Sequence, residues 1–427
     1  MALIGRLIDK LLKRGTITVI APDGKRTTYG PGGGKAITIR ITDHKVLLDL
    51  VRNPRLGLGE AYMDERLIVE DGTILDLLEL ITSSNRWEDG ARGRKLIGKS
   101  KLSELKALWR RNKPAKARRN VAHHYDLGNE LYEIFLDDDL QYSCAYFTDP
   151  ANSLEQAQAD KKAHIAAKLD LKPGHKVLDI GCGWGGTALY LHRTANVDVL
   201  GITLSEAQLK VARKRAMDAG VADHVRFELI DYRDVEGQFD RIVSIGMFEH
   251  VGLAHYEEFF AQCRDLLKPD GVMLLHTIGR IGSSSGAPDP FTDKYIFPGY
   301  HLPSLAQVSA ASAKTRLIAS DVEILRLHYA YTLRHWLDRV TRARAKIEAI
   351  YDARFFRMWE CYLAGGIVMF ETGSGCNYQI QYVRDRNALP ITRDYIAAAE
   401  TRYREAAVRK PAPAISRRAR RVTASRN

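Results

Sequence analysis

A regular alternation of apolar runs and helical segments between residues 175 and 279 is the strongest constraint on how this chain folds. Each apolar run is short enough for a strand, and the segments between the runs repeat apolar residues at helical spacing. Strands joined by helical crossovers form a mostly parallel sheet with helices on both faces. We therefore expect an α/β fold whose ligand lies beyond the carboxyl ends of the strands. The predicted strands are residues 175–181, 197–203, 225–231, 239–246 and 271–279, and the predicted helices are residues 185–193, 205–220 and 254–268.

The first predicted strand runs into the glycine-rich loop of VLDIGCGWGG, which indicates a cofactor site. Glycines let the backbone approach a ligand closely, and the helix that follows presents free N–H groups. The spacing is G-x-G-x-G-G rather than the G-x-G-x-x-G of nicotinamide binders. An aspartate two residues before the first glycine suits a cationic ligand and would repel a pyrophosphate. The pattern resembles the first motif of class I S-adenosylmethionine-dependent methyltransferases, and it assigns to the cofactor Asp179, Gly181, Cys182, Gly183, Trp184 and Gly185.

The next two strands end in polar residues that could complete this site. The second strand ends in GITLSEAQ, where many methyltransferases carry an acid for the ribose hydroxyls, so hydroxyl and amide groups must serve here. The third strand ends in an Asp-Tyr pair suited to the edge and face of adenine. Taken singly, each could be a polar cap on a strand. In register with the first motif, binding is favoured for Thr203, Leu204, Ser205, Gln208, Asp231 and Tyr232.

The formal net charge of +12 is concentrated in two segments. Residues 91–120 hold 12 Lys and Arg and one acid, and residues 409–427 hold seven and no acid. Nucleic acid and an anionic membrane surface would both attract such segments, and each Lys or Arg near an anionic leaflet contributes about 1 kcal/mol. The alternative is that they are solvated, partly disordered runs.

The rest of the chain suggests two folded parts. Residues 1–90 read as a small α+β domain with strands at 16–21 and 36–41 and helices at 44–54 and 73–84. Residues 91–120 read as a basic linker, 121–400 as the catalytic domain and 401–427 as a basic disordered tail. Residues 1–15 have the pattern of an amphipathic helix with a basic side, which could lie on lipid or pack on protein.

No apolar run approaches the roughly 20 residues of a membrane-spanning helix. The five cysteines include no C-x-x-C pair, which fits a reducing cytoplasm and argues against a zinc site. The tandem His123-His124 suggests a metal, but no third ligand is in view, so we expect no metal.

Five motifs in order, YSCAYF, GCGWGG, SIGMFEHVG, LLHTIG and HYAYTL, resemble those of the cyclopropane fatty acid synthases and the related mycolic acid methyltransferases. The likeness covers residues 125–380. The N-terminal GLGEAYMDERLIVEDG resembles the extra domain of the synthases that act on phospholipids. The resemblance implies methylation of a cis double bond in an acyl chain, followed by ring closure when a bound bicarbonate removes a proton.

The resemblance also implies the residues that hold the bicarbonate. The side chains are those of Glu249, His276 and Tyr329, with backbone near Cys144 and Ile278; Tyr142 and Ser143 lie against the cofactor, and His250 is structural. From the residues alone, Glu249 could equally be an acid at a helix start. His276 could be a satisfied core histidine, and Cys144 an inert thiol.

One departure is Gly366, at a position where relatives often have a cysteine. The predicted activity is conversion of unsaturated phospholipid acyl chains to cyclopropane chains by a cytoplasmic enzyme peripherally attached to the inner leaflet. The resemblance also implies a homodimer. The first alternative is a lipid C-methyltransferase of the same fold that gives methyl-branched or methylene products. A nucleic-acid methyltransferase is remote because the D/N-P-P-Y/F motif is absent.

Overall fold

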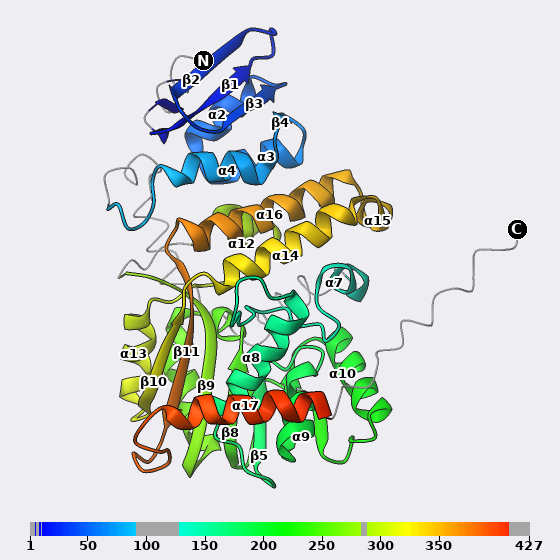
Figure 1. The fold of residues 1–427 in the computed structure, drawn as a ribbon, viewed down its shortest axis with the longest axis vertical. Helices are drawn as coiled ribbons and strands as arrows, with labels where there is room; N and C mark the ends of the chain where they lie inside the picture. Colours follow the sequence, from blue (N-terminus) through cyan, green and yellow to red (C-terminus); the bar gives the residue numbers. More distant parts are fainter. Residues whose placement is uncertain (1–4, 6–7, 10, 91–127, 283–287, 410–427) are drawn as a thin grey trace, which may run out of the picture.

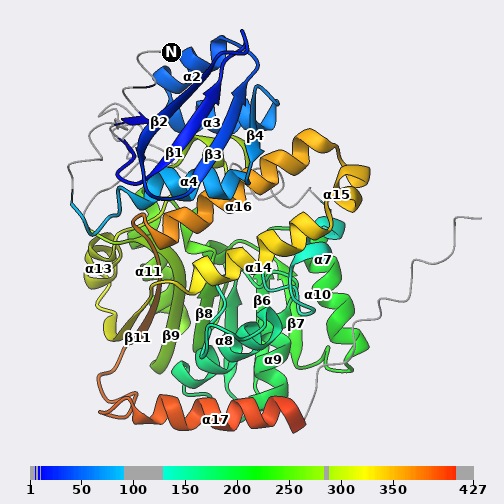
Figure 2. The same ribbon diagram turned by 45° about the horizontal axis from the view of Figure 1, so that its top comes forward.

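The computed structural model describes residues 5, 8–9, 11–90, 128–282 and 288–409 (Figure 1). The basic linker, most of the expected tail and the His123-His124 pair lie outside these residues. Three layers follow one another along the molecule: an N-terminal sheet with its helices, a pair of long helices, and a large central sheet (Figures 1 and 2).

The central sheet has seven strands. Parallel pairing joins the five strands that the alternation predicts, while the two strands after residue 317, at one end of the sheet, pair antiparallel and were not predicted. The α/β prediction is confirmed. In order across the sheet the strands are β10 (Ile318–Leu325), β11 (Gly375–Val383), β9 (Leu267–Arg280), β8 (Phe239–Ile245), β5 (Lys176–Ile180), β6 (Asp198–Thr203) and β7 (Val225–Leu229).

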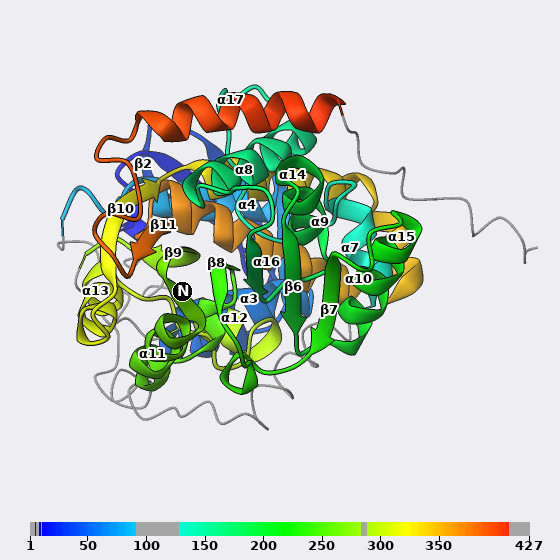
Figure 3. The ribbon, with the colours of Figure 1, turned by 90° about the horizontal axis from the view of Figure 1, so that it is seen from below.

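Helices cover both faces of this sheet and form two separate apolar cores with it (Figure 3). The short 3-10 turns η2 (Tyr232–Asp234), η3 (Phe248–His250) and η4 (Leu253–His255) follow the strand ends. One face carries α8 (Leu154–Lys168), α9 (Gly186–Ala195), α10 (Glu206–Asp218) and α17 (Asp394–Arg409), and the other carries α11 (Tyr256–Leu266) and α13 (Leu305–Lys314).

The expected start of a disordered tail at residue 401 is wrong. The helix α17 continues to Arg409 because its inner face packs on α8. Tyr403 is buried, and the Arg404 guanidinium pairs with Asp160 of α8 at 2.8 Å. Its high content of Arg and Ala reflects an amphipathic helix rather than an unfolded segment.

The N-terminal part folds around a four-stranded sheet in which the two central strands, β1 and β3, pair in parallel. Two of its strands and one of its helices were not predicted: one strand and the helix contain glycines, and the other strand has only five residues. Across the sheet the strands are β2 (Arg26–Gly32), β1 (Gly15–Ile20), β3 (Ala36–Ile41) and β4 (Leu67–Asp71), and the helices are α2 (Lys45–Arg52), α3 (Pro54–Met63) and α4 (Ile74–Ser83).

A helical layer connects the two sheets. The helices α3 and α4 pack on α16, which in turn packs on α14, and buried apolar residues of all four belong to one cluster. The layer consists of α7 (Asn129–Phe135), α12 (Pro290–Tyr295), α14 (His328–Arg342), α15 (Arg344–Ile350) and α16 (Ala353–Glu371).

Within the described residues, no helix is long and apolar enough to cross a membrane.

Candidate active site

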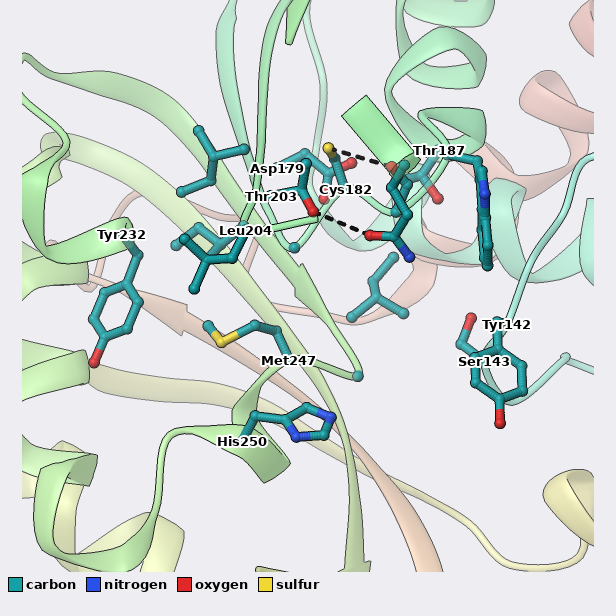
Figure 4. A pocket seen from close by; sticks show the side chains of 18 of the residues that line it. Tyr142, Ser143, Asp179, Cys182, Thr187, Thr203, Leu204, Tyr232, Met247 and His250 are labelled. Carbon is teal, nitrogen blue, oxygen red and sulfur yellow. Dashed lines mark hydrogen bonds between the residues drawn. The ribbon is translucent and has the colours of Figure 1, made fainter. Parts of the chain in front are cut away.

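A pocket opens at the carboxyl ends of β5, β6 and β8, where the strand pattern predicts a ligand. Figure 4 shows Tyr142 and Ser143 on one side and Tyr232 on the opposite side. Twelve of the fourteen residues assigned to the cofactor line this pocket: Tyr142, Ser143, Asp179, Gly181, Cys182, Gly183, Trp184, Thr203, Leu204, Gln208, Asp231 and Tyr232.

The glycine-rich loop turns sharply from β5 into α9. Gly181 and Cys182 both donate backbone hydrogen bonds to the Ile202 carbonyl, at 3.0 and 2.9 Å, which tie the loop to β6. Gly185, with φ of +81°, does not line the pocket. A Cβ there would lie 2.6 Å from the Phe227 ring, so this glycine serves the packing of the helix start, and its contact with the cofactor stays a prediction.

Asp179 is the buried acid of the pocket. Its side chain is 1% exposed, and its Oδ2 atom has no hydrogen-bond partner among the described residues. Burial raises the pKa of Asp179 to about 7, and the nearby Lys161 ammonium opposes that rise. A buried carboxylate without a full complement of donors fits a cationic ligand group, such as the ammonium of an amino acid.

The loop after β6 is held by its own polar side chains. The Thr203 hydroxyl donates to Gln208 Oε1 at 3.0 Å, so the two pocket residues orient each other. The Ser205 hydroxyl accepts from the Gln208 N–H at 3.3 Å and thereby caps α10. Ser205 is not among the described residues that line the pocket, so its contact with the cofactor stays a prediction.

Asp231 lines the pocket and is paired with Arg233. The Arg233 guanidinium donates to both of its carboxylate oxygens, at 2.8 and 2.7 Å, and lies 5.4 Å from the centre of the Tyr232 ring. The sequence analysis did not select Arg233. The pairing neutralises the acid and leaves the tyrosine ring as the apolar surface on which a flat base could rest.

Other pocket residues missed from the sequence lie beside selected ones. Met247 and His250 follow β8, so the rule that places ligands at strand ends could have found them. His250, which the sequence analysis assigns to structure, has its ring at the wall of the pocket (Figure 4). Burial lowers the pKa of His250 to about 4, so it is neutral at physiological pH. The remaining missed residues are Leu140, Gln141, Ile180, Thr187, Ile202, Ile230, Arg233, Ile245, Gly246 and Val251.

None of the five residues assigned to bicarbonate is among the described residues that line the pocket. Glu249 is buried, and its Oε1 accepts the Ile278 backbone N–H. Burial raises the pKa of Glu249 to about 7. Its second oxygen, Oε2, has no partner among the described residues. The structure thus brings Glu249 and Ile278 into direct contact.

The other three residues assigned to bicarbonate, Cys144, His276 and Tyr329, lie on different segments of the chain. Cys144 and Tyr329 belong to the same apolar cluster, against which Ile278 also packs. His276 of β9 faces two amide side chains of β11, Asn377 at 2.8 Å and Gln379 at 3.2 Å. Burial holds the pKa of His276 well below its usual value, so the ring is neutral.

Tyr142 joins the cofactor pocket to the aromatic part of this apolar cluster. Its ring lines the pocket and stacks on Trp336 of α14, with ring centres 5.2 Å apart. Trp336 meets Tyr329 edge-on at 5.8 Å. A dry aromatic surface therefore begins at the wall of the cofactor pocket.

Within the described residues, no group of three or more His, Cys, Asp or Glu could hold a metal ion.

Comparison with known proteins decides the family. The family model described as mycolic acid cyclopropane synthetase matches residues 112–380. The chain belongs to this family. A second model, a domain of unknown function, matches residues 7–88. The predicted resemblance is therefore confirmed.

Three relatives each match nearly the whole chain. The cyclopropane-fatty-acyl-phospholipid synthase of Escherichia coli is 36% identical over 91% of this chain and 96% of its own. A probable fatty acid methyltransferase of Pseudomonas putida is 35% identical, covering 87% and 94%. The tuberculostearic acid methyltransferase UfaA1 of Mycobacterium tuberculosis is 32% identical, covering 90% and 91%.

Solved structures of this family share the fold. The cyclopropane synthase MmaA2 of Mycobacterium tuberculosis superposes with a TM-score of 0.59 at 34% identity, covering 62% of this chain and 97% of its own. The mycolic acid cyclopropane synthase CmaA1, solved with S-adenosylhomocysteine, gives the same values. The fold is that of the class I S-adenosylmethionine-dependent methyltransferases, and the chain is such an enzyme, with S-adenosylmethionine as its cofactor.

The position of Gly366 lies in α16 of the family domain. A Cβ there would meet only Leu333, whose Cδ1 is 3.0 Å away. Cys361, five residues earlier, is buried, and burial raises the pKa of its thiol to about 12. It is therefore an inert thiol rather than a nucleophile.

Proposed function

We propose that this enzyme transfers a methylene group from S-adenosylmethionine to the cis double bond of unsaturated phospholipid acyl chains and forms a cyclopropane ring. The cofactor supplies an electrophilic methyl group. The alkene gains that methyl and then loses one proton from it, and a new carbon–carbon bond closes the ring. The three relatives that match nearly the full length of this chain support transfer to lipid acyl chains.

The observation that carries the proposal is the Glu249 carboxylate behind the cofactor pocket. One oxygen is fixed by the Ile278 N–H, and the other has no partner among the described residues. A bicarbonate ion has one O–H group, which can donate to that oxygen, and the ion would supply the base for ring closure. We infer that Glu249, His276 and Tyr329, with backbone near Cys144 and Ile278, hold it. For His276 to bind the ion, one of its two amide partners must move away from the ring. Gln379 has the longer contact with the ring, so it is the partner expected to move.

Aromatic side chains support the same chemistry. Addition of a methyl group to an alkene leaves positive charge on carbon, and aromatic faces attract cations when water is excluded. Tyr142, Trp336 and Tyr329 provide such faces in succession from the pocket wall. These groups therefore exclude water and favour charge on the acyl chain rather than on a polar nucleophile.

The experiment uses liposomes of cis-unsaturated phospholipid with methyl-labelled S-adenosylmethionine, and NMR of the product fatty acids. Upfield ring protons are expected for the native protein. Glu249→Gln should keep cofactor binding and lose most of the ring product, whereas the exposed Glu228→Gln on β7 should match the native protein. Label in lipid that is unaffected by Glu249→Gln would refute the role of Glu249, and no label in lipid would refute the proposed substrate.

A second candidate is a lipid C-methyltransferase giving methyl-branched or methylene products. It is favoured by the glycine at position 366 and by two relatives described as fatty acid methyltransferases. The same NMR spectra separate the outcomes, because methyl and methylene branches lack the upfield ring protons.

We also propose that the enzyme works at the cytoplasmic leaflet and binds anionic lipid through its basic segments, residues 91–120 and 410–427. Electrostatic attraction of this kind is screened by salt. Sedimentation with anionic liposomes should therefore fall as salt rises. Binding that is unchanged by salt, or equal on neutral liposomes, would contradict an electrostatic contribution.

A further inference from the structure

Lys161 of α8 is a fully buried cation directly behind the cofactor pocket. Its side chain is 0% exposed. The Nζ atom donates to Gln141 Oε1 at 2.7 Å and to Ser143 Oγ at 2.8 Å. Both acceptors line the pocket. Lys161 thus donates its hydrogen bonds to neutral oxygens of the pocket wall rather than to a carboxylate.

This arrangement fixes the direction in which Ser143 can donate. In its ammonium form Lys161 has donors and no acceptor, so Ser143 Oγ must then accept from it. The hydroxyl hydrogen of Ser143 is then left to donate elsewhere, and the side that lines the pocket is open to it. Ser143 is therefore prepared as a donor, with a positive charge behind it that strengthens attraction to an anion.

Gln158, one turn earlier on the same helix, holds the backbone of this segment. Its Nε2 donates to the carbonyl oxygens of Gln141 at 3.2 Å and of Ser143 at 3.0 Å. The Gln141 amide oxygen also accepts from the Thr187 hydroxyl at 3.3 Å. The face of α8 formed by Gln158 and Lys161 thus fixes both the path of residues 141–143 and the orientation of their side chains.

We propose that Lys161 is a positioning residue that prepares the Ser143 hydroxyl to bind the carboxylate of the amino-acid end of S-adenosylmethionine, while Asp179 accepts its ammonium group. The inference rests on the proposed function, since it deepens how that cofactor is held. An amino acid carries its two charges on one carbon, so it needs a donor and an acceptor close together. Both requirements are met at this pocket, where Ser143 and Asp179 are lining residues and the Lys161 charge acts on the Asp179 carboxyl.

The burial of the Lys161 charge favours an anionic ligand nearby. Burial lowers the pKa of Lys161 to about 7, while the carboxyls of Asp137 and Asp139 act against that fall. A buried ammonium without a bonded counter-ion is costly. A ligand carboxylate one hydroxyl away would offset part of that cost. The other titratable groups that act on this lysine or respond to it are Lys162, Cys144, Asp179 and His276.

The test compares two ligands that differ in the amino-acid end. S-adenosylhomocysteine has the carboxylate and ammonium, and 5′-methylthioadenosine has neither. Calorimetric titration of Lys161→Met should show binding of S-adenosylhomocysteine weakened by about tenfold or more, because a charge-assisted contact is lost. Binding of 5′-methylthioadenosine should change by less than about twofold. In turnover, KM for S-adenosylmethionine should rise by a similar factor with kcat much less affected.

Lys162→Met is the matched control. Lys162 is the next residue of α8, is also buried, and pairs with Asp139 rather than with the pocket segment. It should leave the ratio of the two affinities unchanged. Ser143→Ala should reproduce the selective loss, and adding Lys161→Met to it should cost little more, since both act through one hydroxyl.

Equal weakening of both ligands in Lys161→Met, or no weakening of S-adenosylhomocysteine, would overturn the proposal. If Lys161→Met fails to fold, Ser143→Ala decides: an unchanged ratio of affinities refutes the proposal, and a selective loss supports it. Failure of the native protein to bind S-adenosylhomocysteine would instead refute the assignment of the cofactor, and so the proposed function itself.

Discussion

Replacing Asp179 with Asn should stabilise the cofactor-free protein at alkaline pH while weakening cofactor binding. Burial raises the pKa of Asp179 from 3.8 to about 7. A carboxyl whose pKa is higher in the folded state costs stability once the pH exceeds its unfolded value. For this shift the cost is about 4 kcal/mol when the carboxyl is fully ionised near pH 8. Asn has the same shape and cannot ionise, so Asp179→Asn avoids that cost.

The pH dependence has a definite sign. The cost is absent below the unfolded pKa of 3.8, grows as the pH rises towards about 7, and is complete above it. Urea unfolding without cofactor measures the free energy of unfolding of both proteins. The advantage of Asp179→Asn should grow from about 2 kcal/mol at pH 5 to about 4 kcal/mol at pH 8.

An exposed acid provides the control for this experiment. Glu236 lies in the turn before β8, and Glu236→Gln should show no comparable growth with pH. Binding of S-adenosylhomocysteine should fall in Asp179→Asn, because the acceptor for the ligand's ammonium loses its charge. An advantage that stays constant from pH 5 to pH 8, or a variant less stable than the native protein at pH 8, would refute the reasoning.

Two glycine substitutions test packing around the site. Gly185→Ala places a Cβ 2.6 Å from the Phe227 ring at φ +81°, so we expect a loss of about 2 kcal/mol or more in unfolding free energy and weaker cofactor binding; an unchanged urea midpoint would contradict this. Gly366→Cys meets only the end of Leu333 at 3.0 Å, which can move, so stability should change by less than about 1 kcal/mol and the rate of ring formation by less than about twofold. A large gain in ring product in Gly366→Cys would show instead that the missing cysteine matters.

The cofactor site was predictable because it follows from strand ends. Parallel strands bring their carboxyl ends to one edge, so residues after β5, β6 and β7 could be assigned to one pocket from the sequence alone. Gly185 and Ser205 belong to the same turns but serve the packing and capping of a helix start, and they are not among the residues that line the pocket. Whether a turn residue faces a ligand or its own helix depends on side-chain direction, which spacing does not determine.

The polar surroundings of the site were not predictable from local patterns. The helix α8, with the sequence LEQAQADKKAHIAAK, reads as a solvated helix, yet nearly all of it is buried. Its charged residues find partners far along the chain, such as Glu323 for Lys168 and Glu400 for His164. The strands β10 and β11 escaped prediction for a related reason. In β11, Gln and Asn replace the apolar residues of a buried strand because their side chains bond across to β9 and α8.

The buried charges around the pocket fit a site built for its ligands. Burial raises the pKa of Asp179 and of Glu249 and lowers that of Lys161, so each group resists its charged form in the ligand-free protein. Apolar residues of similar size would cost the fold less. The three groups differ in what would satisfy them: an ammonium for Asp179, a hydroxyl donor for Glu249, and an anion beyond Ser143 for Lys161. The amino-acid end of the cofactor would meet the needs of Asp179 and Lys161, and the hydroxyl of a bicarbonate ion would meet that of Glu249, whereas an uncharged cofactor end would leave Asp179 and Lys161 without a counter-charge.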